Sequence, residues 1–252
     1  MTNTLGKIGG FTSDNGAEII TFNPATNQLF IVSGGTELQI LDISDPTNIT
    51  EAIPSVDLAS FVPGIGGANS IAFSNNILAV ALEAETSTDN GFVALVDVPV
   101  FTTNPADPNA LTIVQVGALP DMVTFTPDGS TVLVANEGEP DEGVDPDGSV
   151  SIIDVSGGVA NTTQNNVSTA DFTAFNGREV DLGNRGVRIF PGTTVSQDVE
   201  PEFIAVSPDG TTAFVTLQEA NAFGVVDIAS STVVDILPLG VKDYSQGQTV
   251  PG

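Results

Sequence analysis

The chain has 252 residues, 40% of them hydrophobic, and carries 32 acidic against five basic residues, for a formal net charge of −27. The hydrophobic fraction excludes a disordered chain, and the shortage of basic residues excludes nucleic acid and anionic membrane surfaces as partners. Because the sequence has no Cys and no His, it also excludes disulfides, thiolate metal sites and the usual Ser-His-Asp catalysis.

The predicted elements form one unit that repeats four times along the chain. Each copy has an apolar strand, a tight polar turn, a second strand, and a third strand of the form apolar-apolar-Asp-apolar. The first strands lie at 18–22, 69–73, 121–125 and 202–206, and the second strands at 29–32, 77–81, 132–135 and 213–217. The third strands carry Asp42, Asp97, Asp154 and Asp227. A supersecondary unit that recurs at this period determines the architecture before any function is assigned.

A fourth strand follows at 55–61, 112–118 and 232–239, and in copy three an insertion, roughly 156–197, obscures it. Four antiparallel strands per ~50 residues, repeated in tandem, are typical of β-propeller blades. We therefore expect an all-β fold with a single propeller segment, 1–252, whose blades span about 17–61, 68–118, 120–182 and 200–240. A β-sandwich is the alternative, but it does not require the same Asp in every copy.

The N-terminal segment 4–11 resembles the outer strand of copy four more than any first strand. An outer strand therefore precedes copy one, which gives five outer strands for four inner triplets. Because a closed ring needs equal numbers, we expect a partial, open ring of four blades, the N-terminal part of a longer propeller of about seven blades. Such an arc exposes one blade face at each end.

The Asp that recurs in every third strand is predicted to be structural. An acidic side chain at the same place in each blade is suited to accept hydrogen bonds from turn amides or from a neighbouring blade. A catalytic residue has no reason to occur four times.

Oxygen-bearing side chains gather where the first strands begin and the second strands end, which is one face of a propeller. Glu18, Asn69, Asp121 and Glu202 begin the first strands, and Glu83, Glu137 and Gln218 follow the second strands, with Asn136 and Glu139 beside Glu137. The loop 137–147 adds Asp141, Glu142, Asp145 and Asp147, and the loop before copy four adds Asp198 and Glu200. All of these converge around the mouth of the central channel.

A ring of carboxylates and amides without His or Cys matches hard cations, Ca²⁺ above Mg²⁺. Like charges this close also raise one another's pKa unless a cation neutralises them. The predicted metal ligands are Glu18, Asp121, Glu137, Glu139, Asp145, Asp147, Asp198, Glu200 and Glu202. The alternatives are that these acids are solvated and cap turns, as in a salt-adapted surface, or that two of them form a catalytic acid/base pair.

Three of the five basic residues, Arg178, Arg185 and Arg188, fall within eleven residues of the insertion. Together they suit an anion such as phosphate. The alternative is that they pair with nearby acids, such as Glu179, Asp181, Asp198 and Glu200.

Five segments carry recognisable motifs: 134–140 (VANEGEP), 145–154, 186–190, 198–210 and 233–243. These segments resemble the choice-of-anchor I family of bacterial surface and secreted proteins. The resemblance covers most of the chain and implies an extracellular or cell-surface β-propeller, similar to those with YVTN-type repeats, that continues with further blades. Some members are labelled as alkaline phosphatases or are fused to phosphoesterase modules.

We therefore expect a non-catalytic, Ca²⁺-stabilised binding or adhesion module at the cell surface, although no signal peptide is visible. Its expected partners are the remaining blades of the full-length propeller and an extracellular ligand or surface. No run of 18 apolar residues exists, so no membrane insertion is expected. The alternatives are part of a Ca²⁺-dependent phosphoesterase of the alkaline phosphatase or phytase type, and a purely structural surface-array protein.

Overall fold

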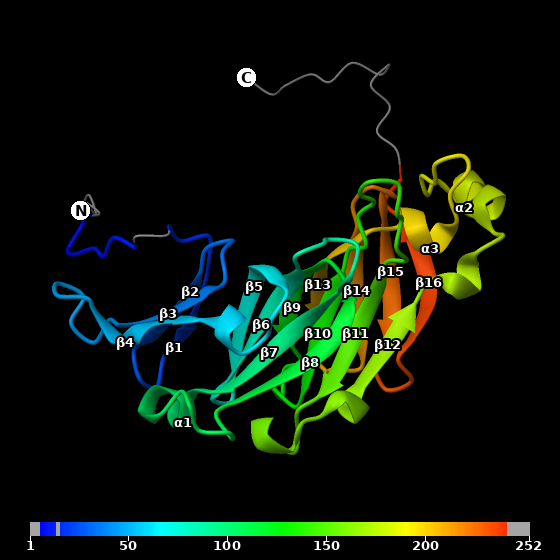
Figure 1. The fold of residues 1–252 in the computed structure, drawn as a ribbon. Coiled ribbons are helices and arrows are strands. Elements are labelled where there is room, and N and C mark those ends of the chain that lie inside the picture. Colours follow the sequence, from blue (N-terminus) through cyan, green and yellow to red (C-terminus); the bar gives the residue numbers. More distant parts are fainter. Residues whose placement is uncertain (1–5, 14–15, 241–252) are drawn as a thin grey trace, which may run out of the picture.

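The structure is a computed structural model that describes residues 6–13 and 16–240. In these residues the strands form four antiparallel sheets of four strands, and each sheet is one blade. Figure 1 shows the sheets in chain order from blade 1 at the left to blade 4 at the right. Blade 1 contains β1 (Ile19–Asn23), β2 (Gln28–Val32), β3 (Glu37–Asp42) and β4 (Thr50–Asp57), and blade 2 contains β5 (Ile65–Ser74), β6 (Ile77–Ala84), β7 (Asn90–Asp97) and β8 (Leu111–Ala118). Blade 3 contains β9 (Pro120–Phe125), β10 (Thr131–Asn136), β11 (Ser149–Asp154) and β12 (Val167–Asp171), and blade 4 contains β13 (Pro201–Val206), β14 (Thr212–Leu217), β15 (Ala222–Asp227) and β16 (Thr232–Pro238).

Short helices occupy the connections between strands. They are η1 (Leu58–Ser60), α1 (Val98–Thr103), η2 (Val159–Asn161), η3 (Gln164–Asn166), η4 (Thr173–Phe175), α2 (Glu179–Arg185) and α3 (Val195–Asp198). The last three lie in the long connection between blades 3 and 4, residues 172–200, which we call the connector. The connector lies beside β16 in Figure 1, and Arg185 of α2 pairs with Asp235 of β16.

The predicted all-β blades are confirmed, with three corrections to their strands. The outer strand of blade 1 is β4, not 55–61, because Asp57 accepts a hydrogen bond from the Ala59 amide and starts η1. The predicted insertion 156–197 contains β12, which completes blade 3 by pairing with β11. The predicted outer strand 4–11 lies partly outside the described residues, and its described part, 6–11, forms no strand. An outer strand forms by pairing with the third strand of a blade. In the described residues every third strand is already paired with its own fourth strand, so none is left to pair with the N-terminal segment.

The recurring Asp is structural, as predicted. The carboxylates of Asp42 and Asp154 accept hydrogen bonds from the amides two residues on, at 2.8 and 2.9 Å. Asp227 accepts from both the amide and the hydroxyl of Ser230, each at 2.8 Å, and Asp97 caps α1 through the Val100 amide at 3.1 Å. Each Asp therefore fixes the turn that leaves the third strand.

Three apolar clusters join the described blades, and each cluster lies between two neighbouring blades. The first groups Phe30 with Leu78, the second Leu95 with Val132, and the third Leu133 with Val215. Side chains alternate between the two faces of a strand, so an inner blade buries both of its faces. In β6 and β10 nearly every residue is buried, as this arrangement requires.

The two ends of the arc differ. On the outer face of blade 1, Gln39 and Leu41 are buried, and Phe11 and Ser13 line a hollow against Gln39 and Glu51. The N-terminal segment therefore lies along this face. On blade 4 the burial of β14 alternates residue by residue, so one of its faces is uncovered.

Candidate functional site

Glu18, Asn69 and Asp121 meet at the centre of the arc, as predicted. They line one hollow of about 390 Å³ together with apolar residues of the first strands. Asn69 Nδ2 donates to Glu83 Oε2 at 3.4 Å and to the Pro120 carbonyl at 3.3 Å, which ties blade 2 to the start of β9. Blade 4 contributes Phe203 to this hollow, whereas the predicted ligand Glu202 is not in its lining.

Glu137 lies at the centre of a larger group of carboxylates. The Glu137 amide donates to the Leu119 carbonyl at 2.9 Å, which holds the end of β10 against the start of β9. Burial raises the pKa of Glu137 to about 7, aided by the negative charges of Asp121, Glu139, Glu202 and Glu200.

Glu200 is the second carboxylate with a strongly altered pKa. It has a φ of 41°, a left-handed conformation in which residues other than Gly are uncommon. Its pKa is raised to about 7, mainly by burial. The negative charges of Glu219, Asp198, Glu139 and Asp145 raise it further. Burial also raises the pKa of Glu202, together with Asp121 and Glu219.

These carboxylates come from blades 3 and 4 and from the end of the connector, and they form one group, which we call the acidic rim. Burial and Glu83 raise the pKa of Asp121, so blade 2 takes part as well. The rim consists of Glu83, Asp121, Glu137, Glu139, Glu200, Glu202 and Glu219. Glu219 was not among the predicted ligands. Its position just after the second strand of copy four could have indicated that it lies on the same face. The predicted mutual increase in pKa is present.

The charges of Asp145 and Asp198 act on Glu200, but together with Asp147 these residues also take part in the packing of the connector. The Ser196 hydroxyl donates to Asp147 at 2.7 Å. Asp198, which is 7% exposed, accepts from the Phe190 amide at 2.9 Å. Asp147 and Asp198 are thus already bound by protein donors. Burial raises the pKa of Asp145, and the negative charges of Asp198 and Asp147 raise it further. The Oδ1 atom of Asp145 is buried without a hydrogen-bond partner.

The carboxylates do not form a ready coordination shell. In the described ranges no group of three or more acidic side chains has an arrangement that could hold a metal ion. The rim residues are close enough to repel one another but are not gathered around one point. Binding a cation there requires side-chain movement.

The three arginines do not share one site. Arg178 pairs with Asp181 at 3.0 Å, as the alternative interpretation predicted, and Arg185 pairs with Asp235 at 3.3 Å. Arg188 pairs with Glu219 and also donates to the carbonyl of that residue. Arg188 is therefore the one arginine that reaches the acidic rim. Asp235 and Glu219 were not among the predicted partners, because both are remote in sequence.

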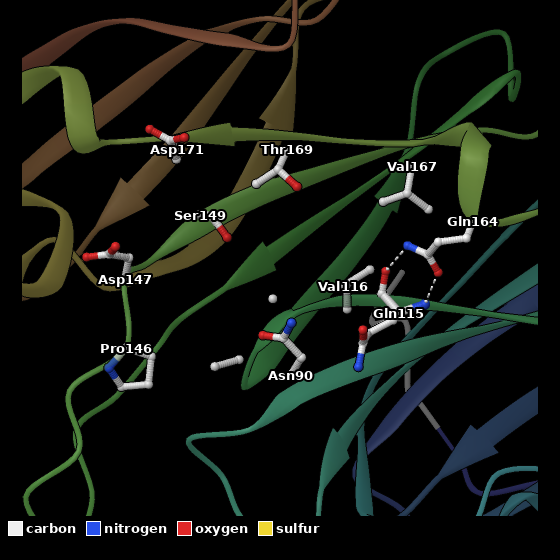
Figure 2. A pocket seen from close by; sticks show the side chains of 12 residues that line it. Asn90, Gln115, Val116, Pro146, Asp147, Ser149, Gln164, Val167, Thr169 and Asp171 are labelled. Carbon is white, nitrogen blue, oxygen red and sulfur yellow. Dashed lines mark hydrogen bonds between the residues drawn. The ribbon is translucent and has the colours of Figure 1, made fainter.

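A second hollow, of about 420 Å³, lies between the outer parts of blades 2 and 3 and is shown in Figure 2. Asn90 and Gln115 form its blade 2 side, and Asp147, Ser149 and Asp171 lie across from them. Gly117 forms part of the wall, and a Cβ there would lie 2.8 Å from the Asn136 side chain. Asn136, placed beside the acidic ring by sequence, is instead fully buried and donates to Ser149 and Ser151.

Comparison with protein families matches residues 18–249 to the choice-of-anchor I domain. A search of curated protein sequences gave no match. In the described residues no helix is long and apolar enough to cross a membrane.

Solved structures with a similar fold include hydrazine synthase from Kuenenia stuttgartiensis, with a TM-score of 0.56, 20% identity, and coverage of 93% of this chain and 52% of that chain. Hsv2 from Kluyvelomyces marxianus has a TM-score of 0.52 and 10% identity, covering 93% of this chain and 60% of that one. Both are β-propeller-like. The chain thus spans about half to three fifths of the structures it matches. The family match covers nearly all of this open β-propeller arc, so the chain belongs to the choice-of-anchor I family.

Proposed function

We propose that this chain is a non-catalytic binding or adhesion module of a longer cell-surface protein, and that its acidic rim binds divalent cations, Ca²⁺ above Mg²⁺. The observation that carries the cation proposal is the crowding of carboxylates around Glu137 and Glu200. Their pKa values of about 7 mean that the free rim retains protons at neutral pH. A bound cation removes this repulsion and displaces the protons.

The choice of cation follows from the donor chemistry. The rim offers carboxylate oxygens, which hard cations prefer, and the chain has no His or Cys for softer metals. Ca²⁺ accepts irregular shells of six to eight oxygen ligands, whereas Mg²⁺ demands a near-ideal octahedron. A rim that is not pre-arranged around one point therefore favours Ca²⁺ over Mg²⁺.

The non-catalytic role is better supported than a phosphoesterase. Phosphate chemistry at a Ca²⁺ site needs cationic side chains beside the metal to bind the substrate oxygens. Arg178, Arg185 and Arg188 are each held by a carboxylate, and the three do not face one site. Arg188 alone reaches the acidic rim, and its guanidinium is already paired with Glu219.

Two parts of the proposal have other support. The surface location is supported by the family match, and the longer protein is supported by the partial coverage of the matched structures. The chain accounts for 52% and 60% of two propeller-like structures that it matches. A net charge of −27 also suits an exposed, well-solvated protein.

Thermal unfolding with Ca²⁺, with Mg²⁺ and with EDTA tests the cation proposal. We expect Ca²⁺ to raise Tm, Mg²⁺ to raise it less, and EDTA to reverse the effect. The Glu137→Gln/Glu200→Gln variant should lose the Ca²⁺ effect. Glu51→Gln, which removes one carboxylate charge on β4 of blade 1, away from the rim, should keep it. A Tm that does not respond to Ca²⁺, or a response equal in both variants, contradicts the proposal.

A further inference from the structure

The hollow between the outer parts of blades 2 and 3 is lined by polar groups that have no protein partner. Within the described residues, the side-chain amides of Asn90 and Gln115 and the hydroxyl of Thr169 make no hydrogen bond, although all three line the hollow. Figure 2 shows Asn90 and Thr169 on opposite walls. Polar groups that face a hollow in this state are free to bind a molecule within it.

The two acidic residues of this hollow each keep one carboxylate oxygen for a ligand. Asp171 Oδ1 accepts from the amide and the hydroxyl of Thr173, at 2.9 and 2.5 Å. Asp147 Oδ1 accepts from the Ser196 hydroxyl at 2.7 Å. Within the described residues no donor binds the Oδ2 atom of either side chain. The bonds to Oδ1 therefore hold both carboxylates in place and leave an acceptor atom on each.

Ser149 is the most buried polar side chain that lines the hollow, at 6% exposed. Its oxygen accepts from Asn136 Nδ2 at 3.1 Å, and the same amide donates to the Ser151 hydroxyl at 2.9 Å. A hydroxyl has one hydrogen to donate, and no acceptor among the described residues takes that of Ser149. Asn136 therefore fixes the Ser149 oxygen and leaves its hydrogen for a bound molecule.

A neighbouring hollow of about 530 Å³ shares Asn90 and Gln115 with the first one. Its lining includes Phe92, a half-buried aromatic residue of β7, and the exposed Asp89 in the loop before that strand. The two hollows adjoin at the shared side chains, and we call them together the polar groove. The groove thus has an aromatic ring in one half and carboxylates, amides and hydroxyls in the other.

We infer that the polar groove binds a neutral oligosaccharide. Each hydroxyl of a sugar donates one hydrogen and accepts others, so it suits carboxylates that only accept and amides that do both. The apolar face of a sugar ring suits the Phe92 side chain. Each hollow, at about 420 and 530 Å³, has room for a small ligand, so the groove spans more than one sugar unit. The inference gives the proposed binding role a ligand class and is independent of cation binding at the acidic rim.

Other classes of ligand fit the polar groove less well. No Lys or Arg occurs among the described residues that line it, which disfavours anions. No three acidic side chains in the described ranges are placed to hold a metal ion. An extended peptide would pair with the edge of β8, but Gln164 already occupies the backbone of Gln115 there.

A glycan array that carries neutral, acidic and amine-bearing oligosaccharides tests the inference, with the labelled protein applied in EDTA. We expect neutral oligosaccharides to bind. Calorimetry with a neutral oligosaccharide from the array then compares two variants with the parent. Asn90→Ala/Thr169→Val removes one free polar group from each wall. The control, Asn165→Ala/Ser168→Ala, changes two exposed residues near Thr169 that do not line the groove.

The Asn90→Ala/Thr169→Val variant should bind at least about tenfold more weakly, because it loses two hydrogen bonds to the sugar. The control should bind within about twofold of the parent, and both should unfold at the parent's temperature. Three results overturn the inference: no neutral oligosaccharide binds, only amine-bearing ones bind, or the two variants bind equally well. The Glu137→Gln/Glu200→Gln variant should keep the parent's affinity for the oligosaccharide, so failure of the cation proposal is seen separately.

Discussion

The side-chain amide of Gln164 binds the backbone of Gln115 at both of its polar groups. Gln164 Oε1 accepts from the Gln115 amide at 2.8 Å, and Gln164 Nε2 donates to the Gln115 carbonyl at 3.0 Å (Figure 2). One side chain thus makes the contacts of a neighbouring strand. It satisfies part of the outer edge of β8, the kind of exposed edge that otherwise pairs with other chains.

Replacing Gln164 should therefore loosen blade 2 at its outer strand. Gln164→Ala removes two hydrogen bonds, and we expect the free energy of unfolding to fall by about 1–2 kcal/mol. Hydrogen exchange of the Gln115 amide should become faster, while Thr169, on the neighbouring β12, serves as the control position. An unchanged exchange rate at Gln115 contradicts the role given to Gln164.

The acidic rim should make the protein less stable as pH rises from about 4.5 to 7. The ordinary carboxyl pKa of 4.5 applies to Glu137 and Glu200 in the unfolded chain, and the folded values are about 7. The folded chain binds more protons in this range, so the free energy of unfolding declines with pH. Glu137→Gln/Glu200→Gln should stabilise the protein at pH 8 by about 1 kcal/mol per site after solvent screening, and not at pH 4.

Denaturant titrations at both pH values check this prediction, and Glu51→Gln, which removes one carboxylate away from the rim, is the control. Equal effects of the double variant at pH 4 and pH 8 would show that the folded pKa values are not raised.

The turn carboxylates should have the opposite pH dependence. The amide and hydroxyl of Ser230 hold the pKa of Asp227 below its ordinary value of 3.8. Its contribution is present above that value and is lost as pH falls through the lower folded pKa. Asp227→Ala should therefore destabilise the protein at pH 7 and reduce the loss of stability below pH 4. Unfolding curves between pH 2 and pH 7 measure it, and parallel curves for variant and parent would refute it.

Two glycine substitutions should act in opposite directions. A Cβ at Gly117 would lie 2.8 Å from Asn136 and from the Ser149 hydroxyl, so Gly117→Ala should cost about 1–3 kcal/mol by forcing blades 2 and 3 apart. Gly183 lies inside α2, and a Cβ at this position would have no neighbouring atom within 4 Å. Gly183→Ala should therefore be neutral or stabilise by up to about 1 kcal/mol. Thermal unfolding of the two variants compares them directly.

Much of the fold could be predicted because its signals are local and repeated. Asp42 and its three equivalents mark every third strand, and Pro-Asp-Gly at 127–129 and 208–210 marks two turns, whose final glycines have φ near +70°. β12 was missed because its sequence, VSTAD, is mostly polar and exposed. A strand of that kind is defined by its partner β11 and not by its own pattern.

The candidate site was only partly predictable, for the same reason. The blade repeat predicts that Glu137 and Glu200 converge, because it brings the loops between strands to one face. The repeat does not predict the ion pairs of the connector, because residues such as Arg188 and Glu219 are 31 residues apart in sequence. The use of Asp198 by a local amide is likewise a property of the connector's own loop.

The placement of all three apolar clusters between blades has a consequence for what counts as a domain. A blade taken alone keeps its ladder of strands but loses the side chains that dehydrate it, so it has no interior of its own. Blades 2 and 3 each depend on two neighbours, and blades 1 and 4 on one described neighbour. The smallest unit of this chain with its own apolar interior is therefore a pair of neighbouring blades. Separating two neighbouring blades destabilises both of them.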